Sequence, residues 1–273
     1  MSVEMANLLA CNNQKKSTMP IKLSAVIITF NEERNIGRCL TSLASIADEI
    51  VVVDSCSTDD TVEICRRFAN VRVTEQPFLG HVEQKNFALD QATNDYVLSL
   101  DADEALSEQL QKEILKVKQT SSLDGHYFNR RTNYCGQWVN HCGWYPDRKL
   151  RLFDRRKGRW GGDNPHDLVK MDDEFSGGHL AGDLLHYSYY TISDHIGQTD
   201  KFTTIAAASA YKKGVESSMF KVVTRPCLKF IRDYLLKRGF LDGRRGFIIC
   251  YINALSAFLK YAKLLELQKD STR

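Results

Sequence analysis

Buried apolar runs alternate with helical segments over the first hundred residues, and this order constrains the fold more than any other feature. Strands are predicted for KLSAVIITF, EIVVVDS, VRVTEQ and YVLSLDAD, at residues 22–30, 49–55, 71–76 and 96–103. Between them lie segments 31–47, 57–69 and 81–93, which are typical of helices. Because parallel strands need helical crossovers, this order predicts an α/β fold with a mostly parallel central sheet and helices on both faces.

The pattern changes after residue 120. Shorter strands joined by Gly-rich turns are expected at residues 125–139, 148–156, 166–171 and 179–189. A helical C-terminal third is expected from about Ile192. No internal repeat or low-complexity segment is evident in the chain.

The cysteines argue against a disulfide-stabilised secreted protein, and the N-terminus argues against a signal peptide. Eight cysteines in 273 residues form no Cys-x-x-Cys pair, which indicates a reducing, cytosolic compartment. Cys135, His141 and Cys142 lack an evident fourth ligand, so isolated thiols are favoured over a zinc site. Residues 1–20 are interpreted as a polar, poorly ordered leader, because no basic segment precedes the short apolar LLAC run.

Acidic residues gather where the predicted strands end. Asp101, Asp103 and Glu104 fall within four positions, and Asp54 closes the second strand. Ligands of open α/β sheets bind beyond the carboxyl ends of the strands, so we expect these acids to face a binding crevice. Unpaired carboxylates so close together would repel each other, and a divalent cation removes that repulsion. Oxygen ligands favour Mg²⁺ or Mn²⁺ held between protein carboxylates and a phosphorylated ligand.

Other polar residues are candidates for the same crevice. Asp54 is expected to accept hydrogen bonds from a base or ribose; the alternative is an N-cap of the next helix, for which Ser57 and Thr58 are better suited. Glu32, in the segment TFNEE that closes the first strand, would line the same crevice, and Asn31 is the expected N-cap of the first helix. The pair Lys85–Asn86 is read either as part of the site or as an exposed helix face.

Four segments resemble the successive motifs of family 2 glycosyltransferases. They are SAVIITFNEERNI, EIVVVDSCSTDDT, QKNFALDQAT and YVLSLDADE, and they cover about residues 22–110. The later segments RLFDRRKGRWGGDNPHDLV, LLHYSY and KRGFLDGRRGFIICY resemble the bacterial lipopolysaccharide-core β-1,4-glucosyltransferase group. The resemblance implies a GT-A type fold with a nucleotide-binding half (21–120), an acceptor half (121–215) and inversion at the anomeric carbon.

The resemblance also implies residue roles. Thr29, Glu32 and Asp54 would contact the nucleoside, Lys85 and Asn86 the nucleotide or sugar, and Asp101 the ribose or sugar, while Asp103 would bind the metal with Asp101 beside it. His186 would complete the metal site; the alternative is a hydrogen-bonded histidine in the core.

Inversion in one step needs a general base that takes the proton of the acceptor hydroxyl. The segment GGDNPHDLV offers Asp163 and Asp167, and in the resembled group a His followed by an acid occupies this place, which matches His166 and Asp167. We expect Asp167 to be the base and Asp163 to be the second candidate, the alternative for Asp163 being a turn residue. The tryptophans of the second half are secondary candidates for sugar stacking: Trp138, Trp144 and Trp160.

The last segment, residues 216–273, is expected to form a basic amphipathic helical extension. Between Lys221 and Arg245 there are eight Lys or Arg against two Asp. The following apolar run has about fourteen residues before Lys260, and a span needs about 20. Binding in the interface of an anionic membrane is one reading, and a helix pair with a solvated basic face is the other. No nucleic-acid-binding motif accompanies the charge.

These features predict a metal-dependent, inverting glycosyltransferase. Its donor is expected to be a UDP-hexose, with glucose as the sugar, and its acceptor a lipopolysaccharide-core or other lipid-linked glycan. Its expected place is the cytoplasm, peripheral on the inner face of the membrane. The alternatives are a polyprenyl-phosphate glycosyl synthase, a sugar nucleotidyltransferase, and a non-catalytic nucleotide-sugar-binding protein.

Overall fold

A computed structural model describes residues 20–120, 123–163 and 166–270. The predicted leader, apart from Pro20, lies outside these ranges. The first four strands are parallel and neighbour one another in the order β3-β2-β1-β4. They are β1 (Leu23–Thr29), β2 (Glu49–Asp54), β3 (Val71–Glu75) and β4 (Tyr96–Asp101), joined by the helices α2 (Ile36–Leu43), α3 (Thr61–Arg66) and α4 (His81–Gln91). The predicted α/β order is therefore confirmed, and Asp54 and Asp101 end their strands.

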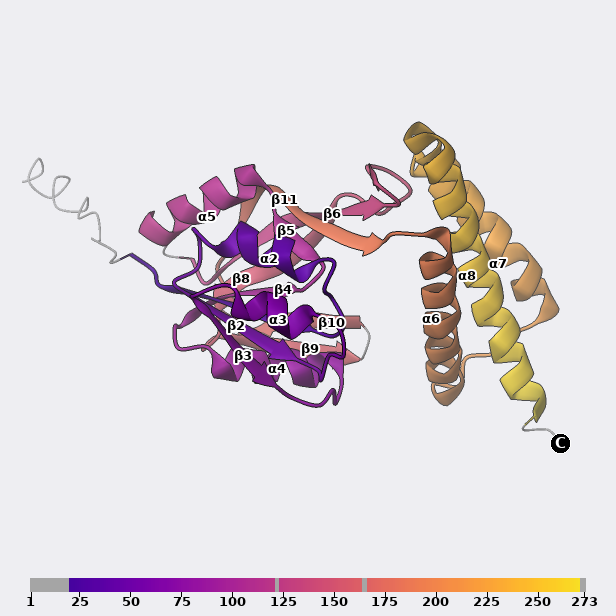
Figure 1. Ribbon diagram of the computed structural model, residues 1–273. Coiled ribbons are helices and arrows are strands. Elements are labelled where there is room, and N and C mark those ends of the chain that lie inside the picture. The colour runs from indigo at the N-terminus through magenta and orange to yellow at the C-terminus, as the bar shows by residue number, and fades with distance from the viewer. Residues whose placement is uncertain (1–19, 121–122, 164–165, 271–273) are drawn as a thin grey trace, which may run out of the picture.

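The sheet continues with strands that follow β4 in the chain (Figure 1). Next to β4 lie β8 (Asp147–Asp154), β6 (Gly125–Tyr134), β11 (Gly177–Tyr189) and β5 (Glu104–Leu106), and β7 (Gln137–Trp138) pairs with β6. Only the pairing of β6 with β11 is parallel here, so the whole sheet is mixed rather than mostly parallel. A separate antiparallel hairpin joins β9 (Gly158–Asp163) to β10 (His166–Met171). The sequence analysis did not predict β5, β9 or the helix α5 (Glu108–Thr120).

Apolar side chains cover both faces of the sheet. Ala25 and Ile27 of β1 belong to a core under α2, α3 and α5, whereas Val26 between them belongs to a second core under α4 and β9. Successive residues of a strand point to opposite faces. The continuous apolar runs therefore exist because helices or the β9–β10 hairpin cover the sheet from both sides.

Asn31 does not cap the first helix, contrary to the prediction. The helix begins at Ile36 after a turn, and Asn31 has a left-handed backbone with φ 53°, a conformation that Asn tolerates better than most residues. Its amide N–H donates to Ser57 Oγ at 2.8 Å, and its Oδ1 accepts from the Thr58 N–H at 2.8 Å. Asn31 thus ties together the loops that follow β1 and β2, at the edge of the sheet where the site lies.

Three helices form a bundle beyond the sheet (Figure 1). The bundle contains α6 (Ile192–Lys212), α7 (Met219–Ile231) and α8 (Gly243–Asp270), and α8 packs against both other helices. A π-helical turn (Arg232–Leu236) and a 3-10 turn (Gly239–Asp242) connect α7 to α8. The helices begin at Ile192, as expected. The predicted division at residue 215 falls between α6 and α7 and stays a prediction.

One buried carboxylate fastens the bundle to the segment that follows β7. Asp242 accepts from the backbone N–H of Asn140 at 3.2 Å and of His141 at 2.8 Å, and it lies 3.0 Å from the His141 ring nitrogen Nδ1. Cys142 packs beside it on Cys250 of α8. Among the described residues, no group of three or more His, Cys, Asp or Glu could hold a metal ion. His141 and Cys142 therefore serve the joint between the bundle and the sheet.

The last helix is longer than its apolar run suggested. Within the described ranges, the segment Gly239–Lys269 is the one helix that is long and apolar enough to cross a membrane, with a mean hydropathy of 1.4 over an 18-residue window of which 28% is buried. The prediction that this segment is too short for a span is therefore wrong by length and composition. The same segment packs against α6 and α7.

Acidification is expected to weaken the joint through His195, which is buried in α6 and bonds Tyr134 Oη at 3.1 Å. Burial lowers the pKa of His195 to about 4. Between pH 6.5 and pH 4 the unfolded chain binds a proton that the folded chain does not, so stability falls as the pH falls, by up to about 3 kcal/mol. Urea unfolding at pH 7 and pH 4.5 should show a smaller loss for His195→Gln than for the unchanged chain. His179→Gln, at an exposed position, is the control, and equal losses in all three proteins would contradict this role.

Candidate active site

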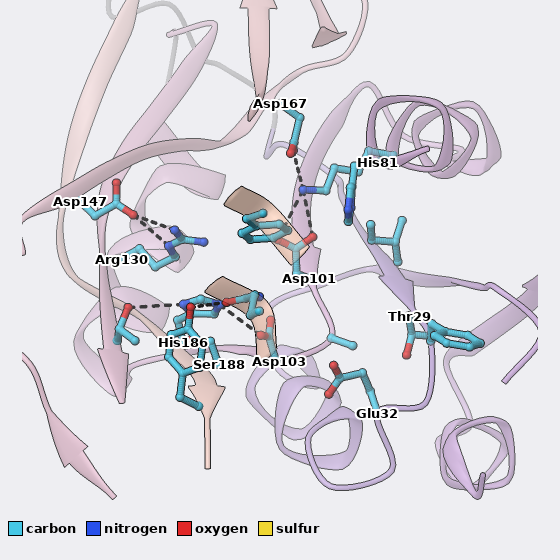
Figure 2. Close-up of a pocket in the computed structure, with 18 of the residues that line it drawn as sticks. Thr29, Glu32, His81, Asp101, Asp103, Arg130, Asp147, Asp167, His186 and Ser188 are labelled. Carbon is cyan, nitrogen blue, oxygen red and sulfur yellow. Dashed lines mark hydrogen bonds and ion pairs between the residues drawn. The ribbon is translucent and has the colours of Figure 1, made fainter. Parts of the chain in front are cut away.

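A cavity of about 760 Å³ opens at the carboxyl ends of β1 and β4 (Figure 2). Side chains from both halves of the sheet and from α6 line it. Seven of the predicted site residues do so: Thr29, Glu32, Lys85, Asp101, Asp103, Asp167 and His186. Chain segments more than eighty residues apart thus contribute to one cavity, as expected from the placement of the acids at strand ends.

Protein cations already neutralise Asp101. Lys85 Nζ lies 3.0 Å from its carboxylate, and Arg151 Nη2 lies 3.2 Å from it. Burial would raise the pKa of Asp101, but the charges of Lys85 and Arg151 outweigh it and hold that pKa well below its usual range. Asp101 is therefore not one of the unpaired carboxylates that the sequence analysis considered, because its cationic partners are distant in sequence.

Glu104 is a structural member of the same network. Its side chain is fully buried and lies 3.2 Å from Arg151 and 3.5 Å from Arg130. It also accepts a hydrogen bond of 3.0 Å from the backbone N–H of Asp101. Glu104 therefore holds the turn after β4 in place and leaves Asp101 and Asp103 to face the cavity.

Lys85 joins the two halves of the site. Its Nζ lies 2.7 Å from Asp167 Oδ2, and the Lys85 side chain is only 5% exposed. Figure 2 shows Asp167 and Asp101 pointing at this nitrogen from opposite sides. Asp167 belongs to β10, in the hairpin above α4. The side chains of Asp163 and His166 lie outside the described part of the structure, so their predicted roles stay predictions.

Asp103 and His186 form a second polar group in the cavity. His186 Nε2 lies 3.1 Å from Asp103 Oδ2, and its Nδ1 lies 3.4 Å from Thr132 Oγ1. Glu32 lies next to Asp103 in Figure 2. Burial raises the pKa of Glu32 to about 7, and the charge of Asp103 adds to the effect. Either a proton or a cation would relieve the repulsion between these two carboxylates.

Two predicted residues make contacts outside the cavity lining. Both carboxylate oxygens of Asp54 accept hydrogen bonds from Ser57, at 2.7 Å from the backbone N–H and at 2.6 Å from the hydroxyl. Asn86 bonds the backbone of Trp160 in both directions, at 3.0 and 3.1 Å, and so ties α4 to β9. Asn86 is thus neither an exposed helix residue nor a lining residue of this cavity.

The tryptophans separate into different environments. Trp160 is buried, its indole N–H donates to Ser99 Oγ at 3.2 Å, and Lys85 lies 4.3 Å above its ring. Trp144 lines the cavity and packs on Tyr189 and His195. Of these two residues, Trp144 is therefore the one with access to a sugar.

Comparison with known proteins identifies the family. The model of glycosyl transferase family 2 matches residues 24–170, more than half of the chain. The chain belongs to glycosyltransferase family 2. The fold described above is accordingly the GT-A type that the sequence resemblance implied, and the chain is a glycosyltransferase.

Curated relatives of this family 2 glycosyltransferase match nearly its whole length. An uncharacterised glycosyltransferase of Rickettsia typhi is 33% identical over 260 residues, which cover 92% of this chain and 89% of the relative. The lipopolysaccharide core biosynthesis glycosyltransferase LpsC of Rhizobium meliloti is 31% identical, with 90% and 93% covered. Among solved structures, S. aureus TarS (residues 1–349) matches with a TM-score of 0.42 and 15% identity over 93% and 92% of the two chains.

The sequence analysis missed several residues of this glycosyltransferase's site. Arg151 stands between Leu150 and Leu152 of β8, and a charged residue flanked by apolar ones is a signal that a buried partner exists. Arg130 of β6 stands between two polar residues and gives no such signal. Ser188 was also missed, whereas Thr29 was predicted. Both residues line the cavity, and their hydroxyl oxygens are buried without a hydrogen-bond partner within the described structure. Buried polar atoms are rarely left unpaired, so these two hydroxyls are suited to a ligand.

Proposed function

We propose that this chain is an inverting, metal-dependent hexosyltransferase that uses UDP-glucose or another UDP-hexose. The proposed acceptor is a lipopolysaccharide-core or related lipid-linked glycan. LpsC, a relative over most of both chains, is by name a lipopolysaccharide core glycosyltransferase, and this supports the acceptor class. Transfer would occur at the cytoplasmic face of the membrane, where a nucleotide sugar and a lipid-linked acceptor meet.

The charge of the cavity carries the proposal of a metal. Five carboxylates line it, on Glu32, Asp101, Asp103, Asp147 and Asp167, against three permanent cations: Lys85 and Arg130 in the lining and Arg151 on Asp101. A diphosphate would be repelled from such a cavity unless a cation entered with it. Mg²⁺ and Mn²⁺ commonly use one or two protein carboxylates and complete their coordination with substrate phosphates and water.

Asp103 and His186 fit that cation best. Their side chains meet in the cavity, whereas Asp101 is engaged by Lys85 and Arg151. Asp101 would then act mainly by orienting Lys85 and by contacting the ribose or sugar. A bound divalent cation would supply charge stabilisation for the leaving diphosphate. Thr29 and Glu32 line the cavity beside β1 and would contact the nucleoside, with Asp54 holding the neighbouring loop in shape.

Asp167 would be the general base. It lies across Lys85 from Asp101, which separates the base from the Asp103–His186 group. In an inverting transfer the acceptor oxygen attacks the anomeric carbon from the face opposite the leaving group. Asp167 would take the hydroxyl proton as that bond forms. Lys85 would hold the carboxylate in position until the acceptor hydroxyl replaces it as the hydrogen-bond donor.

Thermal unfolding with a panel of nucleotide sugars tests the donor and the metal together. At about a hundred times its dissociation constant a ligand adds about 2.7 kcal/mol of stability, which raises the Tm of a chain this size by roughly 5 °C or more. We expect this shift with a UDP-hexose plus Mn²⁺ or Mg²⁺, and little shift with EDTA.

Matched variants make the test specific. Asp103→Asn is expected to remove the metal-dependent part of the shift. Glu63→Gln, at an exposed acid on α3, should leave it intact. If no nucleotide sugar stabilises the protein under any metal condition, the donor assignment is wrong.

A further inference from the structure

The exposed apolar side chains of this protein gather on the helical bundle. Phe220 of α7 and Leu236 at the end of the π-helical turn are 76% and 75% exposed, the highest values for large apolar side chains in the described structure. Single exposed apolar residues need no explanation, but contiguous ones mark interaction surfaces. We call the exposed apolar residues of α7, the turn 235–241 and the start of α8 the docking face.

The α7 part of the docking face is a stripe. Phe220, Val223, Leu228 and Ile231 are 48 to 76% exposed and occupy positions i, i+3, i+8 and i+11, which share one side of a helix. Val222, which points toward the bundle, is buried. The stripe is therefore separate from the face of α7 that packs on α8.

A basic stripe runs beside the apolar one. It consists of Lys221, Arg225, Lys229 and Arg232, at positions i, i+4, i+8 and i+11. Lys229 and Arg232 contact the buried carboxylate of Asp233, at 2.6 and 2.9 Å. Within the described residues, no carboxylate lies within ion-pair distance of the other two cations of the stripe or of Lys237, Arg238 and Arg244 farther along.

The docking face continues around the end of the bundle. In the connecting turn, Leu235, Leu236, Phe240 and Leu241 are all exposed. Phe247 and Tyr251 of α8 are 48% and 61% exposed and stack on each other. Phe247 also meets Phe230 and Tyr234 edge-on, which joins the aromatic residues of both helices into one surface.

We propose that the docking face lies in the interface of an anionic bilayer, with its apolar stripe among the acyl chains and its basic stripe at the lipid phosphates. A helix with an apolar face flanked by Lys and Arg binds in this way. A second copy of the chain fits less well, because a twofold contact between identical faces would bring the two basic stripes together.

An interfacial position agrees with the packing of α8 better than a membrane span does. Lys263 of α8 lies 2.7 Å from Asp200 of α6, and Ile249, Cys250 and Leu264 are fully buried in the bundle. A span would have to withdraw these groups from α6 and from the joint with the sheet. The docking face needs no such rearrangement, because it is exposed as it stands.

The docking face adjoins the cavity. Gly143 lines the cavity, and a Cβ on it would lie 3.6 Å from Lys237 Cγ in the connecting turn. Docking would therefore bring the rim of the cavity near the lipid headgroups. This consequence rests on the proposed function, since a lipid-linked acceptor would then reach the cavity without leaving the bilayer.

Vesicle flotation of the full chain tests the docking face without donor, metal or acceptor, so its result is independent of the proposed transfer. We expect binding to vesicles with 30% phosphatidylglycerol and much weaker binding to pure phosphatidylcholine. Phe220→Ser with Ile231→Ser should lower the partition coefficient at least about tenfold. Lys221→Gln with Arg225→Gln should lower it about fivefold per charge on anionic vesicles only.

The matched control is Leu115→Ser with Lys116→Gln on α5, where both residues are exposed, and it should bind like the unchanged chain. Thermal unfolding of each variant checks that the fold is kept. Absence of binding to anionic vesicles, or equal binding by all variants, would overturn the proposal. So would a dimer in sedimentation analysis that the Phe220 and Ile231 substitutions abolish, or protein retained on vesicles after alkaline carbonate.

Discussion

Replacing Asp167 by Asn should lower kcat by about 10² to 10⁴, the range that a positioned general base contributes. Asn keeps the shape of the side chain but cannot accept the acceptor's proton. The affinity for the UDP-sugar should change little, because Lys85 retains Asp101 as a partner. UDP release with a lipid-linked core saccharide measures the turnover, and calorimetry with UDP and Mn²⁺ measures donor binding.

Two further variants show whether the loss of turnover is specific to Asp167. Asp90→Asn, in an exposed pair with Arg159, is the matched control and should keep normal turnover. Asp163→Asn tests the second candidate, and a large loss there with none at Asp167 would move the base to Asp163. Normal turnover of both variants would favour a polyprenyl-phosphate synthase, since a phosphate acceptor is already an anion and needs no base.

Replacing Arg151 by Met should lower the free energy of unfolding by about 3 to 5 kcal/mol, the cost of removing one partner from a buried ion pair. The Arg151 side chain is 5% exposed and contacts both Asp101 and Glu104. The substitution leaves the fully buried Glu104 with Arg130 alone, at 3.5 Å. Since native domains are stable by only about 5 to 15 kcal/mol, urea unfolding will show the loss as a large shift of the midpoint.

The control for Arg151 is Arg159→Met, which breaks an ion pair whose side chains are more than half exposed and should cost about 1 kcal/mol or less. Adding Glu104→Gln to Arg151→Met should recover part of the lost stability, because the uncompensated charge is then removed. Equal effects of the two Arg variants would mean that the network does not carry the stability assigned to it.

The site residues at the ends of β1 and β4 could be predicted, because the local sequence determines where these strands end. Continuous apolar runs require strands covered on both faces, and parallel strands end at the same edge of a sheet. Asp101 and Asp103 could therefore be assigned to the cavity without any knowledge of the partner strands. The same reasoning placed Glu32, in the segment that closes β1, at this edge, whereas the role of Thr29 came from the family resemblance.

The charge partners could not be predicted because they depend on strand register. Arg151 reaches Asp101 only because β8 runs antiparallel to β4 with Leu98 opposite Leu152, and nothing local in either strand specifies that pairing. The contact of Lys85 with Asp167 joins residues eighty-two positions apart. The prediction that Asn31 caps the first helix was wrong for a related reason. Its side chain accepts a hydrogen bond from the loop after β2 and not from its own helix.

The attachment of the bundle through Asp242 has a consequence for how the enzyme can be divided. Gln198 and Phe202 of α6 form part of the cavity wall. A shortened chain ending near residue 190 would therefore lose that part of the wall as well as the helical bundle. The bundle and the cavity thus share residues of α6. If the bundle docks on a membrane as proposed, a tilt of the bundle would move this part of the cavity wall with it, because Gln198 and Phe202 belong to both.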